Sequence, residues 1–126
     1  MMVIAAVLSA VITTAGVAVS YAPDLPVVRA SGSGADGISP DLIALHTTKK
    51  FGVECKAWKN DLRLRKEKIA ILRDWERTTG MQVFVAWKLP RKKWRFFPLA
   101  ALREAGKTFT LSKRDYFSGM ALEEVA

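Results

Sequence analysis

The chain has 126 residues, of which 50% are hydrophobic and 25% are charged, and this balance excludes a disordered chain and two domains of ordinary size. Its single cysteine, Cys55, excludes an internal disulfide framework and indicates a reducing, cytoplasmic compartment. The formal net charge of +8 favours a polyanionic partner, with nucleic acid ahead of an anionic membrane surface.

Residues 1–22 are uncharged and rich in Ala and Val, whereas every Lys and Arg lies from residue 29 onward. We expect residues 1–25 to be an atypical segment, mainly a helix packed on a domain that spans residues 26–126. A membrane anchor or signal peptide is a second interpretation, because the stretch is about long enough to cross a bilayer. A start site misread from the gene is a third.

The next part of the chain predicts three strands. Residues 26–29 read as a short strand, and the Gly- and Ser-rich residues 30–39 as a loop. Residues 41–46 are mostly apolar and predict a buried strand, followed by a tight turn at 47–50. Residues 51–58 alternate, so that Glu54 and Lys56 share the face opposite to Cys55.

The remaining pattern predicts a helix and two further strands. Residues 65–79 have helical spacing and end at Gly80, residues 81–87 form an apolar run, and residues 94–99 read as a last sheet strand, turning into a short helix through 104. Strands interleaved with a helix indicate an α/β fold with a mixed sheet flanked by helices.

One constellation can carry chemistry. Asp41 begins one predicted strand, and Glu54 and Lys56 lie on the next, so antiparallel pairing would bring the three together. Two carboxylates suit Mg²⁺, which keeps several waters for a phosphate substrate, and a nearby lysine can stabilise charge. These residues indicate a phosphodiester hydrolase, although a Glu-x-Lys pair alone is more typical of an ordinary surface pair on a solvated sheet face.

The surroundings add a family resemblance. Pro40 and Asp41, a strand, a turn and then Glu54-x-Lys56 resemble the PD-(D/E)xK pattern of restriction-endonuclease-like nucleases. Together with residues 28–34 (VRASGSG), 53–56 (VECK) and 94–99 (WRFFPL), the pattern is similar to the archaeal-type Holliday junction resolvases over residues 26–126.

The resemblance implies a restriction-endonuclease-like fold and a homodimeric endonuclease that cuts opposed strands of four-way DNA junctions, in recombination and repair. It implies Mg²⁺ as cofactor, with Mn²⁺ as a substitute, and no organic cofactor. By this likeness Asp41 and Glu54 bind the metal and Lys56 assists catalysis. Arg29 and Ser33 would engage the scissile backbone, with Ser31 as the substitute for Ser33.

One departure leaves an alternative open. Members of this family carry a basic first helix whose Glu completes the metal site, whereas residues 1–25 offer only Asp24. The chain could therefore be a weakened or silent junction-binding protein.

Basic residues around the predicted site would contact DNA phosphates without reading sequence. Trp58 could stack on a base, but burial under the following helix is the favoured interpretation. The basic run at residues 91–95 fits either phosphate contacts or a solvated tip. The expected DNA contacts are Lys59, Arg63, Arg65, Lys66 and Lys68.

Overall fold

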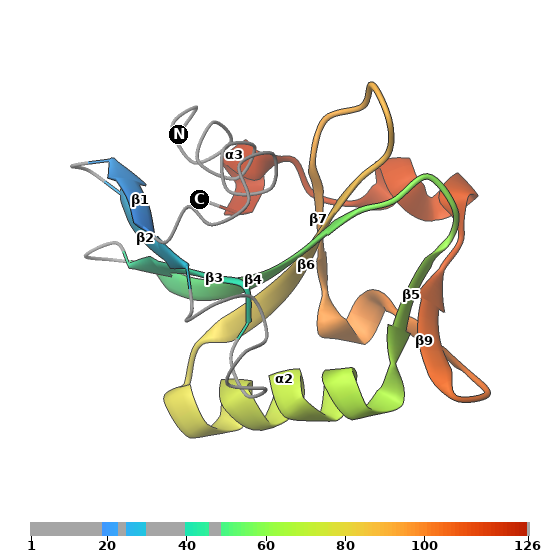
Figure 1. The fold of residues 1–126 in the computed structure, drawn as a ribbon, viewed down its shortest axis with the longest axis horizontal. Coiled ribbons are helices and arrows are strands. Elements are labelled where there is room, and N and C mark those ends of the chain that lie inside the picture. Colours follow the sequence, from blue (N-terminus) through green and yellow to red (C-terminus); the bar gives the residue numbers. More distant parts are fainter. Residues whose placement is uncertain (1–18, 23–24, 30–39, 46–48, 126) are drawn as a thin grey trace.

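A computed structural model describes residues 19–22, 25–29, 40–45 and 49–125 (Figure 1). The expected helix over residues 1–18, the Gly- and Ser-rich loop and most of the turn at 47–50 lie outside the described residues. The described part contains two sheets, one long helix and several short helical turns.

The larger sheet has six strands in the order β1-β2-β3-β4-β6-β7. Only β4 and β6 pair in parallel, and the other neighbours are antiparallel. The predicted mixed sheet is therefore confirmed. The bounds of its strands are β1 Val19–Ala22, β2 Leu25–Arg29, β3 Leu42–Leu45, β4 Lys50–Ala57, β6 Gln82–Lys88 and β7 Arg95–Pro98.

A second, antiparallel sheet has the order β5-β9-β8 and was not predicted. Its first strand, β5, follows β4 after a short connection, and its other two strands come from the later part of the chain (Figure 1). Its strands are β5 Leu62–Arg65, β8 Arg103–Ala105 and β9 Thr108–Leu111, and the helical elements are α2 Lys66–Thr79, η1 Leu99–Ala101, η2 Lys113–Ser118 and α3 Leu122–Val125.

Two apolar clusters cover the two faces of the larger sheet. Phe84 and Ala86 of β6 contribute to the cluster that includes α3, whereas Val83, Val85 and Trp87 contribute to the cluster shared with α2 and the small sheet. A strand with both faces covered needs apolar residues throughout, which is why β6 reads as a continuous hydrophobic run. Figure 1 shows α2 and α3 on opposite sides of this sheet.

The helix α2 confirms the prediction for residues 65–79 within one residue. Ile69 and Leu72 are buried against the sheet, as their helical spacing requires. The helix ends at Gly80, which has a φ of 73° and donates its N–H to the carbonyl of Glu76. Glycine adopts this left-handed conformation without steric cost, so it stops the helix here.

Two expectations about local structure were wrong. Val19–Ala22 does not continue a helix. It forms a strand, and all four of its residues pair with residues of β2. The helix expected through residue 104 stops after Leu99–Ala101, since Arg103–Ala105 pairs with β9. Within the described ranges, no helix is both long and apolar enough to cross a membrane.

The outer edge of the larger sheet is partly covered by the end of the chain. Phe96 of β7 and Met120 exchange two backbone hydrogen bonds, each 2.9 Å long. The neighbouring residue Pro98 closes β7 and has no N–H to donate. This edge strand therefore exposes little free backbone.

Candidate active site

Asp41 and Glu54 come from adjacent antiparallel strands. The pairing of β3 with β4 ends at Leu42 and Val53, so the residue before Leu42 lies opposite the residue after Val53. The backbone N–H of Cys55 donates a hydrogen bond of 2.9 Å to Oδ2 of Asp41. The carboxylate thus takes the place of a strand carbonyl, and the predicted proximity of the two acids is confirmed.

Glu54 is buried, although the sequence suggested an outward-facing position on an exposed face. Its exposed fraction is 9%, because α2 packs over this side of β4. One carboxylate oxygen, Oε2, lies 3.4 Å from Nζ of Lys68 in α2. The other oxygen, Oε1, is buried with no hydrogen-bond partner among the described residues.

This environment changes the acidity of Glu54. Burial, followed by repulsion from Asp41, raises the pKa of its carboxyl from 4.5 to about 7, while Lys68 acts in the opposite direction. Ionisation of this buried carboxyl is costly, so a nearby cation would strongly stabilise its ionised form.

A divalent cation fits these residues. Asp41 and Glu54 present carboxylate oxygens, the ligand type that Mg²⁺ prefers, and Oε1 of Glu54 has no hydrogen-bond partner among the described residues. No third His, Cys, Asp or Glu completes the pair in the part of the chain that the structure describes. Mg²⁺ commonly keeps several waters and binds through only one or two carboxylates, so two ligands suffice for a site of this kind.

Lys56 lies beside this pair rather than within it. Strand alternation puts it on the same face as Glu54, and its side chain is exposed. Its Nζ lies 6.0 Å from the ring centre of Trp58, and no ion pair joins it to either carboxylate in the described residues. The structure therefore confirms that Asp41 and Glu54 lie together, but it does not bring Lys56 into contact with them.

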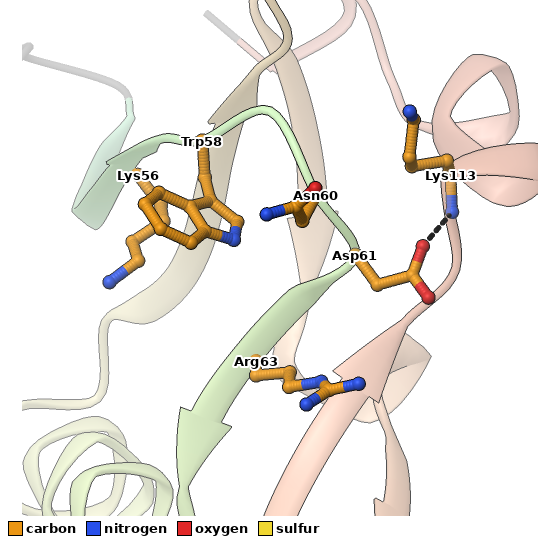
Figure 2. A pocket seen from close by; sticks show the side chains of 6 residues that line it. All are labelled: Lys56, Trp58, Asn60, Asp61, Arg63 and Lys113. Carbon is orange, nitrogen blue, oxygen red and sulfur yellow. Dashed lines mark hydrogen bonds between the residues drawn. The ribbon is translucent and has the colours of Figure 1, made fainter.

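A hollow of about 460 Å³ adjoins Lys56, and Figure 2 shows the side chains around it. Asp61 is fixed there because its Oδ1 accepts a 2.9 Å hydrogen bond from the backbone N–H of Lys113. The hollow is lined by Lys56, Trp58, Asn60, Asp61, Arg63 and Lys113.

The other predicted contacts fall in different places. Arg63 and Arg65 are exposed on β5, where they alternate with buried leucines. Lys66 forms an ion pair with Glu104, and Lys59 lines a second hollow beside Trp58. The basic side chains expected at this surface thus do not form one uniform patch.

The environments of Lys68 and Trp58 were not predicted from the sequence. Lys68 was expected to contact DNA, which stays a prediction, and its Nζ also lies 3.4 Å from Oε2 of Glu54, a contact that the sequence did not indicate. Trp58 was expected to be buried, but 45% of its surface is exposed. Alternation puts Trp58 on the strand face of Glu54 and Lys56, but it does not indicate which part of that face is covered.

The predicted backbone-binding residues are only partly described. The backbone of Arg29 in β2 pairs with Leu42, the neighbour of Asp41, so the chain passes beside the acidic pair at this point. Ser31 and Ser33 lie outside the described residues.

Gly52 sets the position of the segment that carries Asp41. A Cβ atom at Gly52 would lie 2.7 Å from Cγ of Pro40 and 3.0 Å from Cζ3 of Trp75. We expect Gly52→Ala to push Pro40 away from β4, lowering the free energy of unfolding by about 1–3 kcal/mol. Urea unfolding measures this change, and an unaltered midpoint would show that the contact is easily relieved.

The raised pKa of Glu54 predicts a pH-dependent stability in the absence of metal. The folded chain holds the Glu54 proton more tightly than the unfolded chain, so its stabilising effect is complete below pH 4.5 and lost as the pH rises through about 7. We expect the free energy of unfolding to fall by on the order of 3 kcal/mol over this range.

Urea titrations at pH 5 and pH 8 in EDTA measure the decline. Glu54→Gln should remove it, because the amide does not titrate. A decline of equal size in that variant would mean that another group is responsible.

Comparison with known proteins decides the family. A family model described as archaeal Holliday junction resolvase (Hjc) matches residues 22–126. The chain belongs to the archaeal Holliday junction resolvase family. The resemblance inferred from the motifs is thereby confirmed.

Relatives of this resolvase family support the assignment in sequence and in structure. The crossover junction endodeoxyribonuclease Hjc of Archaeoglobus fulgidus is 36% identical over 101 residues, which cover 79% of this chain and 74% of the relative. The solved structure of Archaeoglobus fulgidus Hjc, described as a Holliday junction resolvase from an archaeal hyperthermophile, matches with a TM-score of 0.73 at 30% identity and covers 81% of each chain. The restriction-endonuclease-like fold expected for the resolvase family is therefore confirmed.

Proposed function

We propose that this chain is a divalent-metal-dependent endonuclease that resolves four-way DNA junctions by hydrolysing phosphodiesters in two opposed strands. The observation that carries the proposal is the pair formed by Asp41 and Glu54, with a buried Glu54 oxygen that no described residue satisfies. Membership in the resolvase family supplies the substrate class. The proposed metal is Mg²⁺, for which Mn²⁺ can substitute.

Each residue near the pair has a proposed task. Asp41 and Glu54 hold the cation, and the hydrogen bond from Cys55 fixes the orientation of the Asp41 carboxylate. When bound, the cation neutralises charge on the scissile phosphate and makes water a better nucleophile. Lys56, on the same face, stabilises the negative charge that develops on the phosphate.

The proposed further contacts to the scissile strand come from the end of β2 and from the segment after it. We assign backbone contacts to Arg29 and Ser33, with Ser31 as the substitute, because the β2 backbone runs beside β3 next to Asp41. Their proposed task is to position the phosphate, which accelerates a displacement without any covalent role for the protein.

The remaining basic residues would hold the junction arms. Arg63 and Arg65 extend from one face of β5 and are exposed, so they can reach phosphates. Lys59, Lys66 and Lys68 complete the proposed contacts. Such contacts give affinity that falls with salt and carry no sequence preference, which suits recognition by shape.

The proposed assembly is a homodimer with two active sites, acting in the cytoplasm. A four-way junction has two scissile strands related by approximate two-fold symmetry, and a symmetric dimer presents two equivalent sites to them.

The test is cleavage of a labelled immobile four-way junction in Mg²⁺, with linear duplex of the same sequences as competitor. We expect paired symmetrical nicks that are absent in EDTA and in Asp41→Asn, whose amide can still accept the hydrogen bond from Cys55. Asp74→Asn makes the same chemical change at an exposed position on α2 and should cleave normally. Tight, junction-selective binding without nicks would contradict the proposal and identify a silent binding protein.

A further inference from the structure

Trp58 is exposed at the end of β4, which is unusual for so large an aromatic side chain. Its exposed fraction is 45%, and Phe117 is the other large hydrophobic residue exposed in the described part of the chain. The favoured expectation of burial under a helix was wrong, because the chain turns into β5 before α2 begins at Lys66.

The backbone beneath this side chain is held at two points. The N–H of Trp58 donates to the carbonyl of Lys88, and Nε1 of the buried Trp87 donates to the carbonyl of Trp58, each at 3.1 Å. The ring therefore projects from a fixed base. A binding group that is positioned in advance loses little conformational entropy when a ligand arrives.

Two hollows adjoin Trp58, and basic residues are among the residues that line each of them. The hollow in Figure 2 contributes Lys56, Arg63 and Lys113, against which Asp61 is the single carboxylate. A second hollow of about 320 Å³ adds two more cations, and it is lined by Ala57, Trp58, Lys59, Lys88 and Pro90. A flat aromatic face that adjoins two cationic hollows matches a nucleobase and its neighbouring phosphates.

The distance from the acidic pair limits which base is reached. Trp58 follows Glu54 by four residues on the same face, roughly 13 Å along a strand. The distance between Glu54 and Trp58 along the strand thus corresponds to about four nucleotide steps of 3.4 Å each. Bases inside a duplex are already stacked on both faces, so only an unpaired or opened base near a branch can receive the ring.

We propose that Trp58 stacks on an unstacked nucleobase close to the branch point and so favours branched over linear DNA. The inference rests on the proposed function and deepens it, since it names a residue that recognises the branch. The supporting observations are the exposed ring, its fixed backbone and the cations of the two hollows.

The experiment compares binding of two ligands in EDTA, where no cleavage occurs: an immobile four-way junction and a linear duplex. Trp58→Leu keeps an apolar side chain but lacks the aromatic face, and Trp58→Phe keeps a ring. We expect Trp58→Leu to lose about tenfold in junction affinity with less than about twofold loss for duplex, and Trp58→Phe to recover most of the loss. Both variants retain the Trp58 carbonyl that accepts from Trp87, so their thermal unfolding should match the wild type.

A second readout locates the contact directly. A junction with 5-iododeoxyuridine at the branch point should crosslink to Trp58 on irradiation, whereas a duplex with the same nucleotide should not. Equal loss of junction and duplex affinity in Trp58→Leu would overturn the inference. Unchanged DNA binding with an altered sedimentation coefficient would also overturn it, because the ring would then contact protein.

These results are separate from the proposed activity. Wild-type protein that binds junctions but never cuts them would refute the endonuclease while the effect of Trp58→Leu on binding still decides the stacking. Normal cleavage with no selective effect of Trp58→Leu would refute the stacking alone.

Discussion

Glu54→Gln is expected to reduce the rate of junction cleavage by a factor of at least ~10³, because a neutral amide gives up most of the affinity for the cation that the reaction requires. The substitution keeps the size of the side chain and removes a buried charge. At pH 8 without metal, the folded variant should therefore be at least as stable as the wild type, since ionising Glu54 is costly there. Single-turnover cleavage at saturating protein and urea unfolding measure the two effects.

The matched control for this prediction is Glu67→Gln, an identical change on the exposed first turn of α2. It should leave both the cleavage rate and the stability unchanged. Cleavage by Glu54→Gln within tenfold of the wild-type rate would show that this carboxylate is not a metal ligand.

Trp87→Ala is expected to lower the free energy of unfolding by about 3–5 kcal/mol, a large part of the stability of a small domain. Trp87 is fully buried, and its ring packs edge-on against Tyr116 at 5.2 Å and at a tilt against Phe97 at 6.2 Å. Alanine removes these contacts and leaves a cavity between β6, β7 and η2. Urea unfolding followed by circular dichroism measures the loss.

Trp87→Phe separates the packing from the hydrogen bond. The smaller ring fills much of the cavity, but it cannot donate to the carbonyl of Trp58. We expect an intermediate loss of stability. A variant at an exposed position, Arg77→Ala, should change stability little. If Trp87→Ala unfolds at the wild-type urea concentration, the core around β6 must repack readily.

The fold could be predicted where the signal is local. The alternation of apolar and polar residues over 51–58 predicts β4, although Phe51–Glu54 is buried on both faces, and the apolar run before Leu89 predicts β6 because both of its faces are covered. Helical spacing and Gly80 predict α2. The acidic pair could also be predicted, since a tight connection between β3 and β4 forces antiparallel pairing.

The second sheet could not be predicted because its pairing is distant in sequence. Leu62 of β5 pairs with Leu111 of β9, and β8 is exposed on all three residues, so no short window carries the pattern. Prediction of a four-residue strand needs a partner, and the partner of β5 is far away in the sequence.

The burial of Glu54 and the exposure of Trp58 could also not be predicted from the sequence. Strand alternation assigns Glu54 to a face, but whether that face is covered depends on where α2 crosses it. The helix covers Glu54, and this burial, followed by repulsion from Asp41, raises the pKa of its carboxyl, whereas Lys68 of the same helix lowers the pKa. Trp58 is exposed for the converse reason, because β5 separates it from the helix.

The covered edge of β7 limits how two copies of this chain can meet. Strand addition needs a row of free backbone donors and acceptors, whereas Phe96 already exchanges its two hydrogen bonds with Met120 and Pro98 has no donor. Two subunits therefore cannot join their larger sheets into one continuous sheet across β7. In the proposed dimer, a contact between subunits at this edge would have to rest on side chains rather than on a shared backbone ladder.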